Sequence, residues 1–518
     1  MNADPTPQAE RPALDSLALF RAIPNHTTAR PGRVRSSFRL NQGADHPEIR
    51  LVVNEPEPFE AVPAAELPPA LGTPYSGPID WKLVAAFRGQ TAEALTARLG
   101  EASSKAAQEE LGRAIITELL DADAAEAVTT GRPTWSRAEQ DALGQAVFNS
   151  VFRLGRLQPL VDDDRVENII ILGHDRVWLE LVDGTLVPGP AVADSDEELI
   201  EFIGFLASRE GSARSFSEAH PSLDLRLADG SRLSATNWVT STPSIVIRRH
   251  RLVDVTLDDL VRLGTLTPIM ATFLRAAVKA ELSVVVAGAQ GAGKTTMLRA
   301  LCNEIDPLEQ LATFEDPHEL FLDELRERHA VVHAFEARHG SGEIGADGRP
   351  AGEFGLDMAL PVSQRKNVAR QIVGEVRGPE AWLMIKAMES GSGSLSTTHA
   401  ASAADAMDKL VTCCMEAGRH VSSELAARKL GRAIDLVVHI RLDNTTDVDG
   451  TRHRRRAVSE IVAVGQGEID VGYALTTVFG PVPNAPASPT LLPDHLRVLA
   501  QHGFDIDTFR AQATGARR

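Results

Sequence analysis

Cysteine is scarce in this sequence. The 518 residues include only three, Cys302, Cys413 and Cys414, and two of these are adjacent. Their number and spacing fit neither a disulfide framework nor a zinc site, which indicates a reducing compartment. We expect Cys413 and Cys414 to be small core residues of a helix.

Long hydrophobic runs are absent as well. No stretch approaches the roughly 18 consecutive apolar residues of a membrane-spanning helix. The opening sequence, MNADPTPQAERPALDSLALF, has early acidic residues and no long apolar segment, so we do not expect a secretory signal. The sequence therefore predicts a cytoplasmic protein whose role at a membrane depends on partners.

Positive charge is in deficit. The chain has 53 Lys and Arg against 71 Asp and Glu, which gives a formal net charge of −18. Proteins that coat nucleic acid need a basic surface, so this balance argues against that class, although a local basic groove stays open. Apolar residues make up 43% and charged residues 24%, which is typical of a globular protein.

The N-terminal part of the chain divides into three segments. Residues 1–77 are rich in Pro, Ala and charge, and we predict them to be mostly disordered, with a short helix at Leu17–Ile23. Residues 78–155 have apolar side chains three and four positions apart, which predicts a small helical bundle. Ser136 begins its third helix with the S-x-x-E pattern of a capping box.

After residue 155 the helical patterns give way to patterns that include strands. Residues 156–252 carry short strand patterns, turns at Asp183-Gly184 and Asp229-Gly230, and one amphipathic helix, which predicts an α+β domain. Over residues 253–480, strand and helix patterns alternate, which indicates an α/β domain with a mainly parallel sheet. Residues 481–518 are predicted to be a Pro-rich linker with a short helix.

A glycine-rich stretch carries the clearest functional signal. Residues 288–295, Gly-Ala-Gln-Gly-Ala-Gly-Lys-Thr, fit G-x-x-x-x-G-K-[ST] between an apolar strand and a helical pattern. Such a loop turns its N–H groups toward phosphates at a helix N-terminus, while its lysine reaches the β- and γ-phosphates and its hydroxyl holds Mg²⁺. The expected ATP-binding residues are Gly288, Ala289, Gln290, Gly291, Ala292, Gly293, Lys294, Thr295 and Thr296.

Three later stretches add candidate catalytic side chains. LATFEDPHEL, residues 311–320, places Glu315 at the end of an apolar strand, where a carboxylate can hold Mg²⁺ or polarise water. RQIVGEVRGPEA, residues 370–381, places Glu375 at the end of another strand, followed by Arg377, which can contact a phosphate or pair with Glu375. GSLSTTHA, residues 393–400, contributes His399. The candidate metal ligands are Thr295, Glu315 and Glu375.

In this order, the four stretches resemble the Walker A, Asp box, Walker B and His box of the type II/type IV secretion-system ATPase family. They are most similar to the branch that powers Tad/Flp-type pili. The resemblance covers about residues 80 to 510. The family usually has Arg-Pro-Asp-Arg before Walker B, where this chain has Asn367-Val-Ala-Arg370. The glycine-rich residues 337–355 look like an insertion, and we expect them to form a mobile loop.

The resemblance implies a RecA-like P-loop domain and a homohexamer of two-domain subunits with ATP and Mg²⁺ bound between the domains. It also implies that arginines of the N-terminal domain lie near the γ-phosphate; Arg232, Arg248 and Arg249 match by position. The implied partner is an inner-membrane platform protein of a pilus or secretion system, which would hold the enzyme at the inner face of the membrane.

Two other functions compete with a motor ATPase. A RecA-like nucleic-acid translocase predicts a basic pore, which the acidic balance disfavours, so no nucleic-acid partner is expected. A nucleotide-binding scaffold without catalysis is disfavoured by Lys294, Thr295 and Glu375. The residues leave open whether Glu315 or Glu375 activates water, which arginines act in the site, and what the machine moves.

Overall fold

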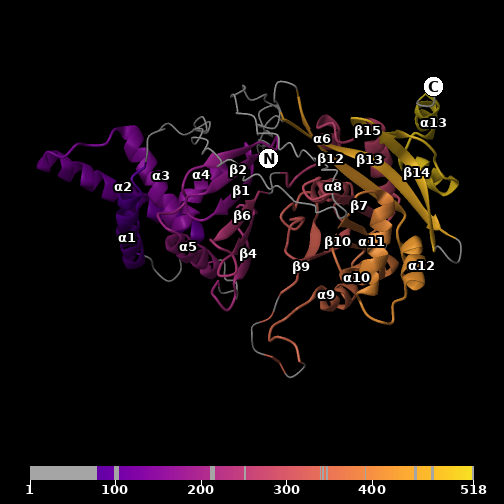
Figure 1. The fold of residues 1–518 in the computed structure, drawn as a ribbon, viewed down its shortest axis with the longest axis horizontal. Helices are drawn as coiled ribbons and strands as arrows, with labels where there is room; N and C mark the ends of the chain where they lie inside the picture. Colours follow the sequence, from indigo (N-terminus) through magenta and orange to yellow (C-terminus); the bar gives the residue numbers. More distant parts are fainter. Residues whose placement is uncertain are drawn as a thin grey trace, which may run out of the picture. The chain divides into compact units, whose positions relative to one another are not determined.

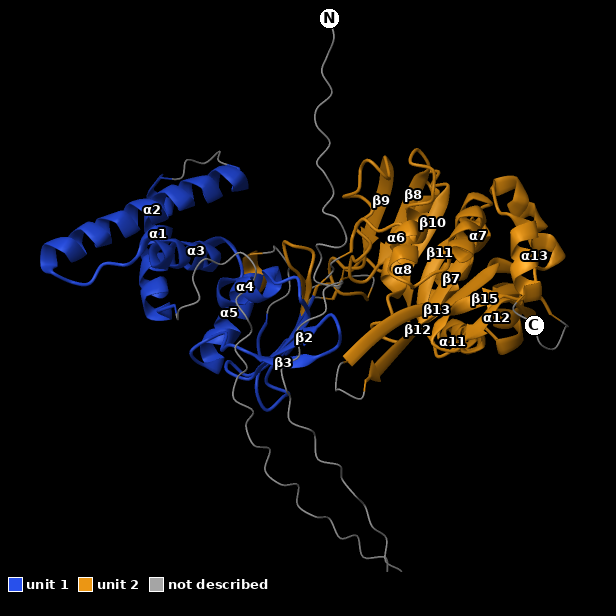
Figure 2. Ribbon diagram, turned by 90° about the horizontal axis from the view of Figure 1, so that it is seen from above, with its two compact units in different colours: residues 1–206, 216–223, 234–248 blue, residues 207–215, 224–233, 249–518 orange. Residues whose placement is uncertain are grey.

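The computed structural model describes ten stretches of the chain, which are residues 79–98, 104–209, 216–249, 252–338, 340, 344–345, 348–390, 393–447, 452–467 and 472–515. The predicted disorder of residues 1–77, with its short helix, lies outside these stretches. Contacts within the chain define two compact units, shown in Figure 2. The first comprises residues 1–206, 216–223 and 234–248, and the second residues 207–215, 224–233 and 249–518.

The first unit begins with a bundle of three helices, α1 (Trp81–Arg98), α2 (Lys105–Thr130) and α3 (Arg137–Phe152), visible in Figure 1. Their shared core includes Phe87, Ile116 and Phe148. The predicted capping box is confirmed: Glu139 N donates to Ser136 Oγ at 3.3 Å, and Ser136 N donates to the Glu139 carboxylate at 2.7 Å. A short 3₁₀ helix, η3 (Gly155–Leu157), and a short α-helix, α4 (Gln158–Asp162), follow.

A six-stranded sheet follows, in the order β3-β2-β1-β6-β5-β4, in which β1 pairs antiparallel with β2 and β6, and β2 pairs antiparallel with β3; helix α5 (Asp196–Arg209) lies between β3 and β4 in sequence. Its strands are β1 (Val166–Leu172), β2 (Val177–Leu181), β3 (Leu186–Gly189), β4 (Ser222–Arg226), β5 (Arg232–Thr236) and β6 (Ser244–Arg248). Both predicted hairpin turns are present. Gly184 and Gly230 have positive φ angles of 82° and 83°, which glycine adopts without strain. Residues 224–233, around the second turn, are counted with the second unit.

The second unit is built on a nine-stranded sheet in the order β15-β14-β13-β12-β7-β11-β10-β8-β9. The six strands from β12 to β9 in this order are mutually parallel, and β13, β14 and β15 pair antiparallel beyond β12. The parallel strands are β7 (Val284–Gly288), β8 (Gln310–Glu315), β9 (Val331–Glu336), β10 (Arg370–Val376), β11 (Leu395–His399) and β12 (Leu436–Thr446). The antiparallel strands are β13 (Arg452–Gln466), β14 (Tyr473–Val482) and β15 (Ala485–Pro489).

Helices cover both faces of this sheet, so its central strands are apolar on both sides (Figure 1). In β7, Val284 and Val286 pack with one set of helices, and Val285 and Ala287 pack with the other. The first set is α6 (Leu257–Arg262), α7 (Pro268–Lys279) and α8 (Lys294–Cys302), and the second is α9 (Leu356–Gln364), α10 (Glu380–Ser390), α11 (Ala403–Met415) and α12 (Ser423–Ala433). The expected α/β domain with a mainly parallel sheet is therefore present. All three cysteines are buried in helices, as expected for Cys413 and Cys414.

The C-terminal segment has the helical structure predicted within residues 481–518, but the rest of it is not a linker. It contains the edge strand β15, the 3₁₀ helix η4 (Asp494–His502) and helix α13 (Ile506–Gly515). Phe504 and Phe509 are buried, and their rings lie 5.3 Å from those of Phe273 and Phe479, respectively. The proline-rich composition was misleading because an edge strand tolerates proline, which has no N–H to donate to a neighbour.

The glycine-rich residues 337–355 follow β9, which ends the sheet on the other side. Two isolated backbone pairings, Arg338 with Phe354 and Ile344 with Pro350, hold parts of this segment together. Residues 339, 341–343 and 346–347 are outside the described part, so the predicted mobility stays a prediction.

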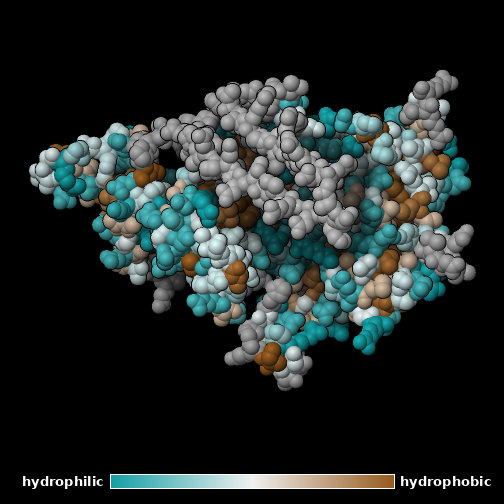
Figure 3. Space-filling view, in the orientation of Figure 1, coloured by the Kyte–Doolittle hydropathy of each residue, from teal (hydrophilic) through white to brown (hydrophobic). Residues whose placement is uncertain are grey.

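The surface drawn in Figure 3 mixes hydrophilic and hydrophobic side chains, with the hydrophobic ones in small separate groups. Among the helices that the structure describes, none combines the length and the apolar character needed to cross a bilayer.

Candidate active site

The four sequence motifs meet at the C-terminal ends of the parallel strands in the nine-stranded sheet. Parallel strands end on the same side, and β11 lies between β7 and β10. Gly288 ends β7, Glu315 ends β8, His399 ends β11, and Glu375 is next to the last residue of β10. The register places His399 directly opposite Gly288. Residues separated by up to about 110 positions in sequence therefore share one site.

The phosphate-binding loop connects β7 to α8. Gly291 and Gly293 have φ angles of 74° and 92°, which an L side chain adopts only with strain. A Cβ atom on Gly288 would lie 2.5 Å from the carbonyl oxygen of Ile440 in β12. Gly293 is the N-cap of α8, and no side chain caps the first N–H groups of this helix. Those donors fit an anionic phosphate, so the loop suits the nucleotide that the motif implies.

A series of polar contacts runs from Lys294 through His399 to Glu375 and Arg377. Lys294 is 7% exposed, and its Nζ lies 3.1 Å from both the carbonyl oxygen of Ala289 and Nδ1 of His399. Nε2 of His399 lies 2.6 Å from Oε1 of Glu375, and Arg377 pairs with Oε2 of the same carboxylate. The Lys294 ammonium can only donate, so Nδ1 of His399 is the acceptor of this contact, and Nε2 on the other side of the ring faces the Glu375 carboxylate.

The carboxylate of Glu375 is kept ionised by these neighbours. Burial alone would raise its pKa, but hydrogen bonds from His399 and Arg377, together with the charge of Arg377, lower the pKa to about 2. Glu375 therefore carries a negative charge at any pH at which the protein functions. The predicted pairing of Arg377 with Glu375 is present.

The Ser/Thr-rich sequence before His399 shapes the strand that carries Glu375. The β10–β11 register shifts between Val373 and Val376. Here Thr397 Oγ1 donates to Gly374 O at 2.8 Å and Thr398 Oγ1 donates to Val376 O at 2.9 Å. A Cβ atom on Gly374 would lie 3.0 Å from Cγ of Glu315. The glycine therefore lets the two acidic strand ends approach each other closely.

Glu315 is held more tightly than Glu375. Its side chain is 2% exposed, against 21% for Glu375. Oε1 accepts the backbone N–H groups of Glu319 and Leu320 at 2.9 and 2.8 Å, and Oε2 lies 2.9 Å from Nδ1 of His318. A carboxylate with these partners is fixed in orientation and balanced in charge.

His318 was missed by the sequence reasoning. Its ring lies between Glu315 and Asp323, with Nε2 at 3.1 Å from the Asp323 carboxylate. Burial would lower its pKa, but bonding to Glu315 and the charges of both carboxylates raise the pKa to about 9. The available signal was its place inside the acidic stretch E-D-P-H-E, where a histidine is surrounded by possible partners.

The predicted metal ligands need a bound nucleotide to complete a site. Within the described stretches, no group of three or more His, Cys, Asp or Glu side chains is arranged to hold a metal ion. Mg²⁺ in nucleotide sites takes phosphate oxygens and water with only one or two protein ligands, so Thr295 in the first turn of α8 fits that need. The metal roles of Thr295, Glu315 and Glu375 stay predictions.

The three positional arginines have different surroundings. Nη1 of Arg232 lies 3.1 Å from the Glu319 carboxylate, and Nη2 lies 3.6 Å from that of Asp224. This pairing links the β4–β5 turn to the Asp box within the second unit. Arg248 ends β6 on the sheet face of Val246, and Arg249 follows the strand; both are half-buried. The approach of these arginines to a γ-phosphate stays a prediction.

Polar contacts of β12 and β13 lie beside the segment that follows His399. Glu460 Oε1 in β13 accepts the N–H of Ala403, the first residue of α11, at 2.7 Å. His439 in β12 and Ser459 in β13 are bonded to each other at 2.6 Å, and both are buried. No local sequence pattern predicts these contacts, because they depend on elements that are distant along the chain.

A phosphate-binding loop beside two strand-end glutamates on a mainly parallel α/β sheet is the arrangement of a P-loop nucleotide-binding site. Residues 221–466 match the family described as "Type II/IV secretion system protein". Over 317 residues, the chain is 29% identical to the type IV secretion system protein VirB11 of Brucella suis biovar 1, which covers 56% of this chain and 84% of that protein. The matches support a type II/IV secretion ATPase.

Two further comparisons add detail. An uncharacterized protein of Methanocaldococcus jannaschii is 28% identical over 275 residues, which cover 52% of this chain and 47% of that protein. The chain thus spans about half the length of that relative. The crystal structure of the Brucella suis VirB11 ATPase with sulphate is 26% identical, covers 62% of this chain and 96% of its own, and has a TM-score of 0.29. The sequence matches, not this superposition, support the assignment.

Proposed function

We propose that this protein is a hexameric motor ATPase that hydrolyses ATP to power pilus assembly or protein secretion through a membrane complex. The observation that carries the proposal is the meeting of Lys294, Glu315, Glu375 and His399 at one sheet edge beside an uncapped helix N-terminus. The order of the four motifs and their residues further support the Tad/Flp branch. An inner-membrane platform protein is the proposed partner.

The residues divide the chemistry among them. The N–H groups of residues 288–296 bind and orient the phosphates, and Lys294 adds positive charge where the β- and γ-phosphates lie. Mg²⁺, when bound with ATP through Thr295, supplies further positive charge to the phosphate oxygens. On binding, the ammonium of Lys294 exchanges its contacts with Ala289 and His399 for phosphate oxygens.

The two glutamates suit different tasks. Glu375, with a pKa of about 2, is a weak proton acceptor and is better suited to orienting water or to balancing charge. His399 contacts both Lys294 and the Glu375 carboxylate. A movement of Lys294 on phosphate binding would therefore change the surroundings of Glu375 through His399. Glu315, fixed by two N–H groups, is the competing candidate for activating water.

The test is the Lys294→Ala variant. It removes the cation that the loop places at the phosphates, so we expect nucleotide binding or turnover to fall to background while the fold persists. Steady-state ATPase assays with and without single-stranded DNA, together with circular dichroism, make the measurement. Near-normal turnover in Lys294→Ala would refute the ATPase assignment, and strong stimulation of the natural chain by DNA would favour the translocase.

A further inference from the structure

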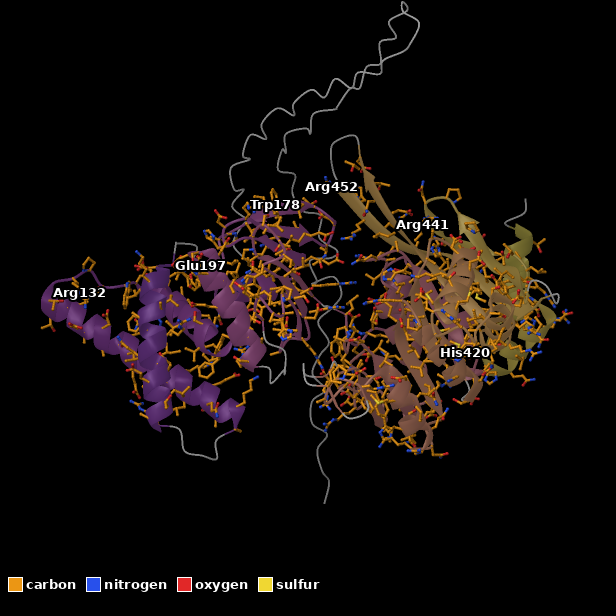
Figure 4. The ribbon with its side chains drawn as sticks, turned by 60° about the horizontal axis from the view of Figure 1, so that its bottom comes forward. Arg132, Trp178, Glu197, His420, Arg441 and Arg452 are labelled. Carbon is orange, nitrogen blue, oxygen red and sulfur yellow. The ribbon has the colours of Figure 1, made fainter. Side chains whose placement is uncertain are left out.

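Strands β12 and β13 continue past the end of the phosphate-binding strand. The last β7 pair joins Gly288 to Ile440 of β12, whereas β12 stays paired to β13 as far as Thr446 with Arg452. Residues 441–446 and 452–457 thus form a two-stranded extension, here called the β12–β13 arm. Figure 4 labels Arg441 and Arg452 on it. The arm projects from the sheet edge at which the nucleotide site lies.

The arm is basic in an acidic protein. Residues 452–456 read Arg-His-Arg-Arg-Arg, in a chain with a net charge of −18. Successive side chains of a strand face opposite sides, so Arg454 and Arg456 share one face and Arg455 lies on the other. Burial follows the same alternation, because Arg454 and Arg456 are half-buried and Arg455 is exposed.

The half-buried face of the arm lies against the phosphate-binding loop. Nε of Arg456 donates to the carbonyl oxygen of Gly291 at 2.9 Å. A Cβ atom on Gly293 would lie 3.5 Å from Cδ of Arg456, and one on Gly291 would lie 3.2 Å from Nη2 of Arg454. Both guanidinium groups therefore approach the loop, at the glycines that give it its shape.

The contact of Arg456 fixes the direction of one loop peptide. In a trans peptide the C=O and the following N–H point to opposite sides. Because the carbonyl of Gly291 faces Arg456, the N–H of Ala292 faces into the loop, where it donates a hydrogen bond to the carbonyl oxygen of Ala289 at 3.2 Å. A peptide turned the other way would present a carbonyl oxygen, which repels phosphate.

Arg454 contributes charge rather than this backbone bond. A guanidinium remains protonated at all working pH values, and a fixed positive charge beside an anion site strengthens binding without reorganisation. Neither arginine belongs to the four motifs, and the pairing of β12 with β7 brings the arm beside the loop.

We propose that Arg454 and Arg456 are further nucleotide-binding determinants of this site. Arg456 positions the Gly291–Ala292 peptide for phosphate binding, and Arg454 supplies positive charge to the polyphosphate of a nucleoside triphosphate. The inference rests on the proposed ATPase function and assigns the arm a part in it.

The experiment compares the full chain with four variants, Arg454→Gln, Arg454→Lys, Arg456→Gln and the control Arg455→Gln. The dissociation constant of Mg²⁺ with a fluorescent ATP analogue is measured at about 0.05 M and about 0.5 M NaCl, where screening differs strongly. Thermal unfolding of each variant monitors the fold, and steady-state assays give KM and kcat.

We expect Arg454→Gln to weaken binding about tenfold at low salt and to reduce the salt dependence, because one screened charge is lost. Arg454→Lys, which keeps the charge, should recover most of the affinity. Arg456→Gln should raise KM more than it lowers kcat, since it disturbs binding and not the acidic residues. Arg455→Gln, on the far face, should stay within about twofold of the natural chain.

The outcomes distinguish a failure of the arm proposal from a failure of the proposed ATPase function. If Arg454→Gln and Arg456→Gln bind the analogue like the natural chain while Lys294→Ala does not, the arm proposal is wrong and the ATPase function stands. Equal losses in Arg455→Gln, or no recovery in Arg454→Lys, would reduce the arm to a structural support and also overturn the proposal. If the natural chain itself fails to bind Mg²⁺-ATP, the proposed function fails and takes the proposal with it.

Discussion

At the scale of single residues, the site is a balance of charges. Glu375 is approached by His399 and Arg377, and His399 in turn by Lys294. A carboxylate with a pKa lowered from its ordinary value contributes stability above the unfolded pKa, about 4.5, and loses it as the pH falls toward 2. A change of activity between about pH 5 and pH 8 must therefore come from another group.

The exchange of Glu375 for Gln tests its chemical role. The amide keeps the size of the side chain but removes the charge that His399 and Arg377 face. We expect Glu375→Gln to bind Mg²⁺-ATP and to lose more than about tenfold in single-turnover hydrolysis, or ~1.4 kcal/mol of barrier. Glu315→Gln, measured beside it with a Mg²⁺ titration, shows which glutamate matters more for turnover. If neither variant loses that much, both role assignments fail.

His318 predicts a pH-dependent contribution to stability. Its pKa is raised from 6.5 to about 9 by Glu315 and Asp323, against the effect of burial. A raised pKa stabilises the fold fully below pH 6.5, and the stabilisation disappears as the pH rises through about 9. We expect His318→Gln to be less stable than the natural chain, by on the order of 2 kcal/mol, near pH 6.

Urea unfolding of both proteins at several pH values makes this measurement. The gap between the natural chain and His318→Gln should narrow steadily between pH 6.5 and about 9. A gap that stays constant across this range would show that His318 acts through packing and not through its charge.

At the scale of elements, the site depends on how far each contact lies along the chain. The strand–loop–helix unit from β7 to α8 was predictable because glycine, lysine and threonine positions are fixed by local geometry. The edge strand β15 and the packing of the C-terminal helices on the core were not, because proline-rich composition was given more weight than Phe504 and Phe509. The arm residues Arg454 and Arg456 lie far from the loop in sequence, and only strand pairing places them there.

The candidate site shows the same division. Lys294, Glu315, Glu375 and His399 stand at strand ends, and the rule that parallel strands end together brought them into one site. Gly374 and Thr397 act in a register shift between β10 and β11, and no single-sequence pattern announces such a shift. His318 needed a three-dimensional arrangement of carboxylates to acquire its environment.

The contact between β13 and α11 yields a prediction at this scale. Glu460 accepts the N–H of Ala403 and so ties the segment after His399 to the sheet. We expect Glu460→Ala to lower kcat several-fold, about 1 kcal/mol, while the affinity for Mg²⁺-ATP changes little. Ser402→Ala, which removes the N-cap bond to Asp405 of the same helix, is the matched control.

A general loosening of α11 would affect Glu460→Ala and Ser402→Ala alike. If their kinetic constants fall together, Glu460 acts only as a helix cap, and its proposed influence on His399 is wrong. The rate constant of single-turnover hydrolysis and the thermal midpoint of each variant decide between the two.

At the scale of the whole molecule, the proposed motor needs more than one subunit. A P-loop domain alone leaves bound ATP open to water, which weakens the charge stabilisation that phosphoryl transfer requires. In the second unit, Arg232 is already paired with Glu319 and Asp224, so a new phosphate contact would have to replace these bonds. Arg248 and Arg249 are the remaining positional candidates, and successive strand residues face opposite sides, so we expect only one of them to act.

We therefore predict a hexamer in the presence of Mg²⁺-ATP, and a severe loss of turnover in Arg248→Ala with a much smaller loss of nucleotide binding. An arginine that acts only in the transition state is worth about a thousandfold or more in rate, whereas its ground-state contribution is small. Analytical ultracentrifugation with a non-hydrolysable ATP analogue measures assembly, and kinetics of Arg248→Ala and Arg249→Ala measure catalysis. Arg249→Ala is the control if Arg248 faces the nucleotide. If Arg249 faces the nucleotide instead, the severe loss is expected in Arg249→Ala and Arg248→Ala is the control. A fully active monomer, or wild-type turnover in both variants, would contradict the ring motor even if the phosphate-binding loop works as proposed, because turnover would then require neither a neighbouring subunit nor an arginine supplied to the site.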